Sequence, residues 1–208
     1  MWIEVPTQPT IAITKWVPSM APFLLKHLNG DAGSAVTRFL RNKIPQPYEQ
    51  KDADDFIAHC SEEKLFTSYA IVLLNTSDSN SNGDNNSQNI LAAIGSIGLV
   101  FNDPTDIEAH VAELGYWLAQ EYWGRGIMSA VVGAFIKNFA APLSISHHRA
   151  DVPLRKIYAY AAIENKGSCK VLELNGFVQE GLLKQYAWKR GEYHDCAVYA
   201  FFFKPVLK

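Results

Sequence analysis

Two glycines, Gly124 and Gly126, flank Arg125 immediately before an apolar segment with helical spacing, in the stretch EYWGRGIMSA. The first N–H groups of a helix have no partner within the helix and lie at the positive end of its dipole, so they attract anions. Glycines before them let an anion approach the backbone without meeting a Cβ atom. The stretch therefore predicts a phosphate cradle. A tight turn between a strand and a helix uses the same residues, so the motif alone leaves both interpretations open.

Neither common nucleotide-binding signature accompanies these glycines. The Walker pattern needs GxxxxGK[ST] and the dinucleotide pattern needs GxGxxG/A, whereas Gly126 is followed by Ile127, Met128 and Ser129. ATP and NAD are therefore disfavoured as ligands of the loop. An interaction module that recognises the phosphates of nucleotides is disfavoured too, because no base-specific or metal-binding signature is present.

The sequence on both sides of the glycines resembles a known family. The segment AELGYWLAQEYWGRGIMSAVV is similar to the acetyl-CoA-binding segment of the GNAT N-acetyltransferases, especially the branch that acts on ribosomal-protein alanine and serine. Downstream, YAYAAIENKGSCKVLELNGFVQEGLL is similar to that branch's strand, Asn-x-x-Ser helix and Asn-Gly-Phe turn, and IPQPYEQKDADDFI is faintly similar. The resemblance covers most of the chain from Pro45 to Phe203, and its two central segments occur in the usual order and at the usual spacing.

This resemblance implies an acetyl-CoA-dependent N-acetyltransferase, an acyltransferase of the EC 2.3.1 class. Its acetyl group would move to a primary amine, either a peptide N-terminus or a small-molecule amine, by direct attack in a ternary complex. The alternative is a non-catalytic acyl-CoA-binding module, because a fold does not guarantee its chemistry. Acceptor specificity is expected to vary in the helices before Pro45 and in the loop at residues 75–89, and a basic substrate would favour an acidic mouth there, where Asp78 and Asp84 lie.

The family pattern Q/R-x-x-G-x-G/A begins here on Trp123 and ends on Met128, so both ends of the pattern depart from the family. Because the loop is expected to bind through backbone N–H groups, these departures concern its fine geometry. The resemblance places the pyrophosphate of coenzyme A over Arg125 to Met128. The implied cofactor-binding residues are Trp117, Leu118, Trp123, Gly124, Arg125, Gly126, Ile127, Met128, Asn165 and Ser168.

Acetyl transfer to an amine needs a neutral nucleophile, a polarised thioester carbonyl and a proton for the departing thiolate. By resemblance, the Leu118 N–H polarises the carbonyl and Glu113 is the base, with His110 as the fallback. Many acetyltransferases have a tyrosine acid where this chain has Leu172, and leucine cannot donate a proton. Ser168 is then the nearest candidate, either for the thiolate or for holding the pantetheine arm. The predicted catalytic residues are Glu113, Leu118 and Ser168.

Three of these residues also have an ordinary structural interpretation. Asn165 could serve only as a helix N-cap, or as a cap and a cofactor contact at once. Ser168 could satisfy backbone groups at the start of the same helix. Glu113 could be an exposed strand glutamate of the kind common at sheet edges.

The composition is that of one enzyme-sized domain, residues 1–208, with a low-complexity loop at 75–89. With 19 basic and 21 acidic residues, the chain lacks the positive field of a nucleic-acid-binding protein. Cys60, Cys169 and Cys196 have no CxxC spacing, so neither a disulfide framework nor a metal site is expected. No apolar run approaches the ~20 residues that span a bilayer. We therefore expect a cytoplasmic monomer or homodimer with no membrane contact.

Hydrophobic periodicity predicts a mixed α/β order. The resemblance implies an α/β (α+β) fold in which helices flank a mixed, mostly antiparallel sheet of about seven strands, with strands 4 and 5 splayed. Asp31 is a plausible helix N-cap, and Pro142 is expected to end the helix that follows the glycine loop. The predicted strands are 10–16, 66–74, 90–101, 110–119, 156–163, 177–188 and 195–203, and the predicted helices are 19–30, 31–43, 52–64, 127–142 and 164–176.

Overall fold

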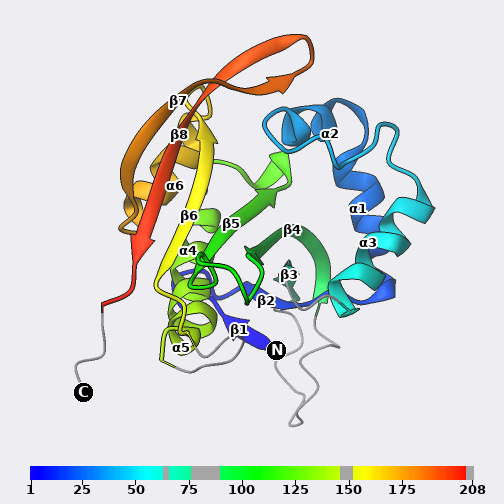
Figure 1. Ribbon diagram of the computed structural model, residues 1–208. Coiled ribbons are helices and arrows are strands. Elements are labelled where there is room, and N and C mark those ends of the chain that lie inside the picture. The colour runs from blue at the N-terminus through cyan, green and yellow to red at the C-terminus, as the bar shows by residue number, and fades with distance from the viewer. Residues whose placement is uncertain (63–65, 76–89, 146–151, 205–208) are drawn as a thin grey trace, which may run out of the picture.

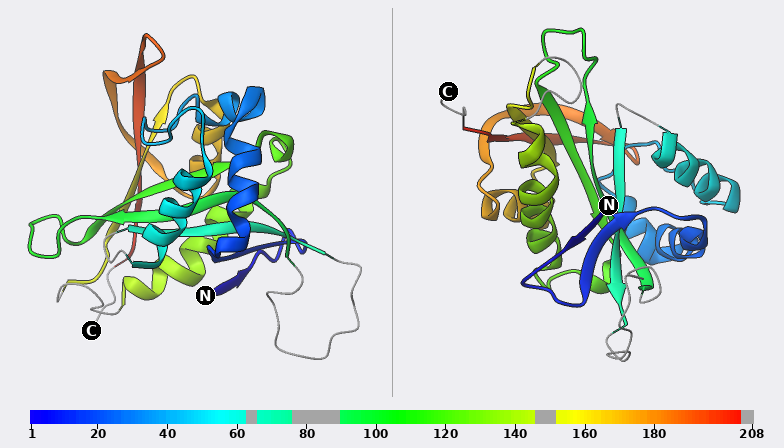
Figure 2. Two further views of the ribbon diagram at one scale, coloured as in Figure 1. Left: turned by 90° about the vertical axis from the view of Figure 1, so that its right-hand side faces the viewer. Right: turned by 90° about the horizontal axis from the view of Figure 1, so that it is seen from below.

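The computed structural model describes residues 1–62, 66–75, 90–145 and 152–204, which form one eight-stranded sheet with helices on both faces (Figures 1 and 2). Most of the predicted loop at 75–89, with Asp78 and Asp84, lies outside these residues. The strands are β1 (Trp2–Glu4), β2 (Ile11–Lys15), β3 (Phe66–Leu74), β4 (Ile90–Phe101), β5 (Val111–Leu118), β6 (Lys156–Ala162), β7 (Val178–Lys189) and β8 (Glu192–Phe202). The helices are η1 (Pro18–Met20), α1 (Ala21–Leu28), α2 (Gly30–Thr37), α3 (Gln50–Glu62), η3 (Gln120–Tyr122), α4 (Ile127–Phe135), η4 (Ile136–Ala140), α5 (Ala141–Leu143) and α6 (Lys166–Leu174).

The predicted strands and helices are all present, but two local expectations were wrong. The eight strands agree with the expected number of about seven; β1 was not predicted, because its three residues are too few to show a period-2 pattern. The N-cap of α2 is Asn29 and not Asp31, which lies in the first turn instead. Pro142 does not end the helix after the glycine loop: it lies in the first turn of α5, where a proline is tolerated, and that helix runs to Leu143.

The sheet is mostly antiparallel, as expected, and its strand order is β1-β2-β3-β4-β5-β6-β8-β7. Only β5 and β6 are parallel neighbours, and they pair over just three residues, Val111–Glu113 with Lys156–Tyr158. By contrast, β4 pairs with β5 along all of Ala112–Leu118. The edge of β5 that faces β6 therefore loses its partner strand after Glu113. This confirms the predicted splay, which separates the strands predicted at 110–119 and 156–163.

Helices cover both faces of the sheet (Figure 2), and an apolar core lies between the sheet and the helices on each face. The helices α4 and α6 cover one core, which includes the fully buried Phe135 and Leu172. The helices α1 and α3 cover the other core, which includes Trp16. Because side chains alternate along a strand, even-numbered residues of β5 such as Leu114 face the first core. Odd-numbered residues such as Glu113 therefore face the side of α1 and α3.

Three general properties follow from the described ranges. No helix in them is long and apolar enough to cross a bilayer. Cys60, Cys169 and Cys196 are free thiols there. Within the same ranges, no three His, Cys, Asp or Glu side chains gather closely enough to hold a metal ion.

Candidate functional site

The glycine loop between β5 and α4 directs a row of N–H groups into open space. Gly124 and Gly126 have φ angles of +74° and +73°, which favour glycine. The first hydrogen bond of α4 runs from the Ala130 N–H to the Gly126 carbonyl, at 3.1 Å. The N–H groups of residues 124–129 have no backbone partner within the described chain. A Cβ atom added at Gly124 would meet nothing within 4 Å. This geometry fits a phosphate group at a helix N-terminus.

Side chains from both sides hold the loop in place. The Gln8 amide, between β1 and β2, donates to the Arg125 carbonyl at 3.2 Å. The Trp123 indole N–H donates to the Leu118 carbonyl at 2.7 Å, although the residue is 47% exposed. The Arg125 guanidinium lies 5.6 Å from the centre of the Tyr122 ring. Trp123, which departs from the family pattern, thus ties the loop to the end of β5.

The Leu118 N–H lies on the open edge of β5. Ladder hydrogen bonds alternate between the two edges of a strand, and the N–H of the next residue, Ala119, bonds to the Ile94 carbonyl of β4 at 2.8 Å. The Leu118 N–H therefore points away from β4, toward the side from which β6 has splayed. It is an unpaired strand N–H directly before the glycine loop. A donor placed in this way can polarise a carbonyl group.

Glu113 lies on the α1 and α3 side of the sheet, in contact with Arg41 and Tyr158. Arg41, from the segment after α2, contacts both carboxylate oxygens, with 2.6 Å between Nη2 and Oε1. Tyr158 is the register partner of Glu113 on β6, and its hydroxyl is 3.5 Å from Oε2. The Glu113 side chain is 16% exposed, and a Cβ atom at Gly115 would meet nothing within 4 Å. The carboxylate therefore borders open space that an amine could enter.

Three tyrosines continue from Glu113 along β6 to β7. The ring centres of Tyr158 and Tyr160 are 5.4 Å apart, and those of Tyr160 and Tyr186 are 4.8 Å apart. Burial and then the Glu113 carboxylate raise the pKa of Tyr158. A hydrogen bond with Tyr186 raises the pKa of Tyr160. The phenols of Tyr158 and Tyr160 are therefore neutral near pH 7, and each can donate a hydrogen bond.

At the start of α6, hydrogen bonds link Ser168 to Asn165 and to Tyr116 of β5. Asn165 is the N-cap, and its side-chain oxygen accepts from the Ser168 N–H at 3.1 Å. The Ser168 hydroxyl lies 2.9 Å from the Tyr116 hydroxyl, which also donates to the Ser168 carbonyl at 3.3 Å. Burial raises the pKa of Tyr116 to about 12, so its phenol stays protonated. The capping interpretation of Asn165 is thus correct, and Ser168 is linked to the strand that carries Leu118.

Some predicted residues lie apart from these groups. Leu172 is fully buried in the core between the sheet and α4, where it supplies no polar group. Trp117 packs against the opposite core, on the same side as Glu113. The His110 carbonyl accepts from the N–H groups of Arg155 and Lys156. The hydrogen-bond partners of the Glu113 side chain among the described residues are Arg41 and Tyr158, not His110.

The N-cap can be tested through stability. Replacing Asn165 with alanine should destabilise the protein by about 1 kcal/mol, since the Ser168 N–H loses its acceptor. For a chain of this size that loss corresponds to a melting temperature about 2–4 °C lower, measured by calorimetry. Asn165→Asp is the matched control, because aspartate caps equally well. An unchanged melting temperature for Asn165→Ala would show that the cap contributes nothing.

Sequence reasoning missed Arg41, Tyr116, Tyr158 and Gln8. Alternation along β5 could have placed Tyr116 on the side of α6, because it shares the parity of Leu118. Tyr158 could have been found by aligning the predicted strands that begin near residues 110 and 156. Arg41 and Gln8 reach the site from segments far away in the chain and carry no local signal.

Comparison with known families identifies the fold. Residues 13–178 match the model of the acetyltransferase (GNAT) domain, which is most of the chain. The chain belongs to the GNAT family. This GNAT chain is 34% identical over 89 residues to the ribosomal-protein-serine acetyltransferase of Escherichia coli (strain K12), and the match covers 43% of the chain and 45% of that relative. The chain thus spans about half the length of the curated relatives it matches.

Solved structures share the GNAT fold over nearly the whole chain. RimL, a ribosomal L7/L12 alpha-N-protein acetyltransferase in complex with coenzyme A, has a TM-score of 0.72 at 22% identity, over 97% of this chain and 98% of that one. Spermidine N-acetyltransferase from Vibrio cholerae, in complex with CoA and spermine, has a TM-score of 0.67 at 16% identity, over 93% and 95%. At this level of identity the likeness shows the fold alone.

Proposed function

We propose that this GNAT protein is an acetyl-CoA-dependent N-acetyltransferase that acts on a primary amine by direct attack in a ternary complex. The observation that carries the proposal is two groups of backbone N–H donors without a backbone partner among the described residues: Leu118, on the open edge of β5, and residues 124–129, at the N-terminus of α4. A phosphate-bearing thioester needs both kinds of donor. The family match and the CoA-bound neighbours support this assignment.

In this proposal, different residues carry out the different steps of acetyl transfer. Coenzyme A would bring the acetyl thioester, held through its pyrophosphate at Gly124 to Met128. The Leu118 N–H stabilises the negative charge that develops on the carbonyl oxygen. Glu113, or a water molecule it holds, would take a proton from the bound ammonium, so that the neutral amine can attack. The Ser168 hydroxyl would donate a hydrogen bond to the departing thiolate, and Tyr116 would fix the orientation of that hydroxyl.

The ion pair between Arg41 and Glu113 sets a condition on this mechanism. Both carboxylate oxygens contact the guanidinium in the resting protein. An amine that uses Glu113 as its base must therefore displace Arg41 or reach the carboxylate through water. The Arg41 side chain is exposed, so its guanidinium stays hydrated when it moves aside, and the incoming ammonium then compensates the charge of Glu113.

The direct test is acetylation by the full chain. The protein is mixed with acetyl-CoA and a panel of N-terminal peptides and small amines, CoA release is followed by a thiol reagent, and products are weighed by mass spectrometry. We expect CoA release with acetylation of at least one amine. Tight CoA binding with no turnover on any amine would instead favour the non-catalytic acyl-CoA-binding module.

The role of Tyr116 gives a further prediction. Tyr116→Phe should lower kcat about fivefold and leave the KM for acetyl-CoA unchanged, because one hydrogen bond worth about 1 kcal/mol is lost at Ser168. Since the Tyr116 phenol is neutral in the wild type, the loss should be the same at every pH from about 6 to 9. Tyr199→Phe is the control, because its hydroxyl bonds to Glu173 instead. Equal kcat losses in both variants would contradict a role at Ser168.

A further inference from the structure

Five cations lie on two segments that meet next to Arg41, the partner of Glu113, and we call them the basic rim. Two segments far apart in sequence supply them: the chain that follows α2 and the tip of the β7–β8 hairpin. In Figure 1 this tip reaches over β5 toward α2. All five side chains are exposed or half-buried. The basic rim consists of Arg38, Arg41, Lys43, Lys189 and Arg190.

Hydrogen bonds join the two segments of the basic rim. The Arg190 guanidinium donates to the Ser34 carbonyl at 3.0 Å and to the Thr37 hydroxyl at 3.2 Å. The Lys189 ammonium donates to the Leu40 carbonyl at 2.9 Å. Each acceptor is a neutral oxygen, so these bonds fix the hairpin tip without cancelling its charge.

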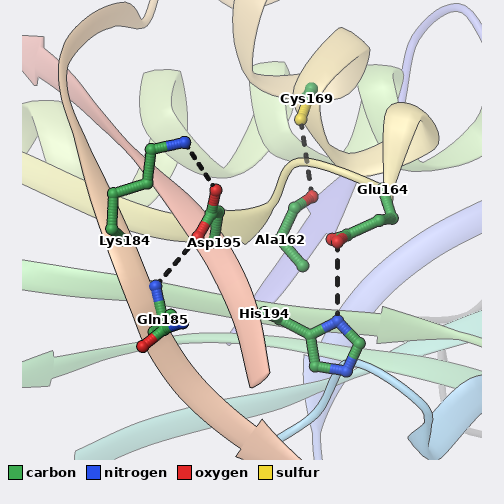
Figure 3. Close-up of polar contacts among 7 residues, drawn as sticks. All are labelled: Ala162, Glu164, Cys169, Lys184, Gln185, His194 and Asp195. Carbon is green, nitrogen blue, oxygen red and sulfur yellow. Dashed lines mark hydrogen bonds and ion pairs between the residues drawn. The ribbon is translucent and has the colours of Figure 1, made fainter. Parts of the chain in front are cut away.

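A bulge in β7 bends the β7–β8 hairpin toward α2. The pairing of β7 with β8 shifts register between Leu183 and Ala187, and Gln185 has a φ of +51°. Asp195 accepts from the Lys184 ammonium and from the Gln185 N–H, both at 2.8 Å (Figure 3). These two bonds hold the pKa of Asp195 below its usual range, so the carboxylate is ionised near neutral pH. The bulge and these two hydrogen bonds therefore fix the direction in which the hairpin tip points.

The positive charge of the basic rim is largely uncompensated. Within the described ranges, Arg38, Lys43, Lys189 and Arg190 form no ion pair with a carboxylate. Burial lowers the pKa of Lys189, and repulsion from the positive charge of Arg190 lowers it further. The whole chain has a net charge of −2, so the positive charge of the basic rim is opposite in sign to the net charge of the protein.

Among the described residues, two carboxylates lie beside members of the basic rim. Glu113 of β5 pairs with Arg41, and Glu192 lies opposite Lys189 across the hairpin turn. Five cations against two carboxylates leave an excess of positive charge. A ligand that extends from Glu113 along the basic rim would therefore lie next to positively charged side chains.

We propose that the acceptor is an acidic primary amine: a peptide N-terminus with carboxylates among its first few residues. The inference rests on the proposed function and narrows its substrate. The α-amine lies beside Glu113 and Tyr158, and the carboxylates that follow bind the basic rim. An extended peptide advances about 3.3 Å per residue, so residues 2 to 5 cover up to roughly 15 Å beyond the amine. An acceptor of this kind can also take Arg41 from Glu113 by offering it another carboxylate.

The test compares three peptides that differ only at residues 2 to 5, which are acidic, neutral or basic. With the full chain and saturating acetyl-CoA, kcat/KM for the acidic peptide should exceed that for the basic peptide at least tenfold at about 20 mM salt. At about 0.5 M salt the ratio should shrink at least threefold, because exposed charges are screened. The neutral peptide should change little with salt.

Variants that replace a cation of the basic rim with glutamine test whether the rim causes the preference for the acidic peptide. Lys43→Gln removes no hydrogen bond found among the described residues. This variant and the double variant Lys43→Gln/Arg190→Gln should lower kcat/KM for the acidic peptide stepwise and spare the neutral peptide. Lys137→Gln is the matched control, because it removes the same charge from η4 on the other face of the sheet. If the double variant unfolds, the salt series on the wild type and Lys43→Gln still decide the question.

Each outcome has a distinct meaning. Equal kcat/KM for all three peptides overturns the acidic acceptor but leaves the acetyltransferase intact. Faster acetylation of the basic peptide overturns it as well. No acetylation of any peptide or small amine would count against the proposed function itself. Tighter binding of a single-stranded RNA oligomer than of the acidic peptide would assign the basic rim to nucleic acid and would also overturn the proposal.

Discussion

Replacing Gly126 with aspartate should abolish measurable binding of coenzyme A. Gly126 is the N-cap of α4, and the loop around it presents the unpaired N–H groups of residues 124–129. A carboxylate about 5 Å from a phosphate oxygen costs about 3 kcal/mol at an effective dielectric constant of about 20, so Kd should rise more than 100-fold. Isothermal titration calorimetry with coenzyme A measures the change.

Gly126→Asn is the matched control for this variant. Asparagine has the shape of aspartate, tolerates the φ of +73° comparably and adds no charge. A Cβ atom at this position would approach only the Gln8 amide, at 4.0 Å, so neither side chain is excluded by the fold. Gly126→Asn should therefore bind coenzyme A more weakly than wild type but far better than Gly126→Asp. A folded Gly126→Asp protein with wild-type affinity would remove the pyrophosphate assignment.

Glu113→Gln should lower turnover about 100-fold or more while coenzyme A binding persists. The amide keeps the shape of the carboxylate and can still accept from Tyr158, but it cannot take a proton from an ammonium. The variant also loses the charge that pairs with Arg41, so its melting temperature must be measured alongside its activity. Steady-state kinetics with one peptide and one alkylamine give kcat and kcat/KM.

The pH profile distinguishes loss of a base from loss of structure. Wild-type kcat/KM should rise with pH through an apparent pKa set by the base and the amine together. Activity of Glu113→Gln should recover where the free amine forms unaided, near pH 8 for a peptide N-terminus and near pH 10 for an alkylamine. A structural defect would depress activity at every pH. Wild-type turnover at neutral pH would move the base elsewhere, and His110→Gln would be the next variant to make.

The order of elements and the glycine loop could be predicted from the sequence because both depend on local pattern. The apolar spacing after Ile127 and the capping side chain of Asn165 act within one helix, and each is present as expected. The splay of β5 from β6 came from family resemblance and not from periodicity. Its consequence for the Leu118 N–H depends on the β4 register, which the structure supplies.

The acceptor side of the site could not be predicted in the same way. Arg41 and Glu113 are 72 residues apart, and Arg190 and Ser34 are 156 apart, so no sequence window contains either pair. Their meeting depends on the bulge near Gln185 and on the path of the chain after α2. The sequence left the acceptor open, and Asp78 and Asp84, which an acidic mouth would use, lie outside the described residues.

The docking of the hairpin tip on α2 also constrains the order in which the molecule can be assembled. The contacts of Lys189 and Arg190 close loops of about 150 residues, whose entropy cost is met only after the rest of the sheet has formed. During synthesis the glycine loop leaves the ribosome about 60 residues before the hairpin tip. A nascent chain that ends before β7 already carries the glycine loop but lacks Lys189 and Arg190. The proposed coenzyme A site should therefore form before the basic rim is complete.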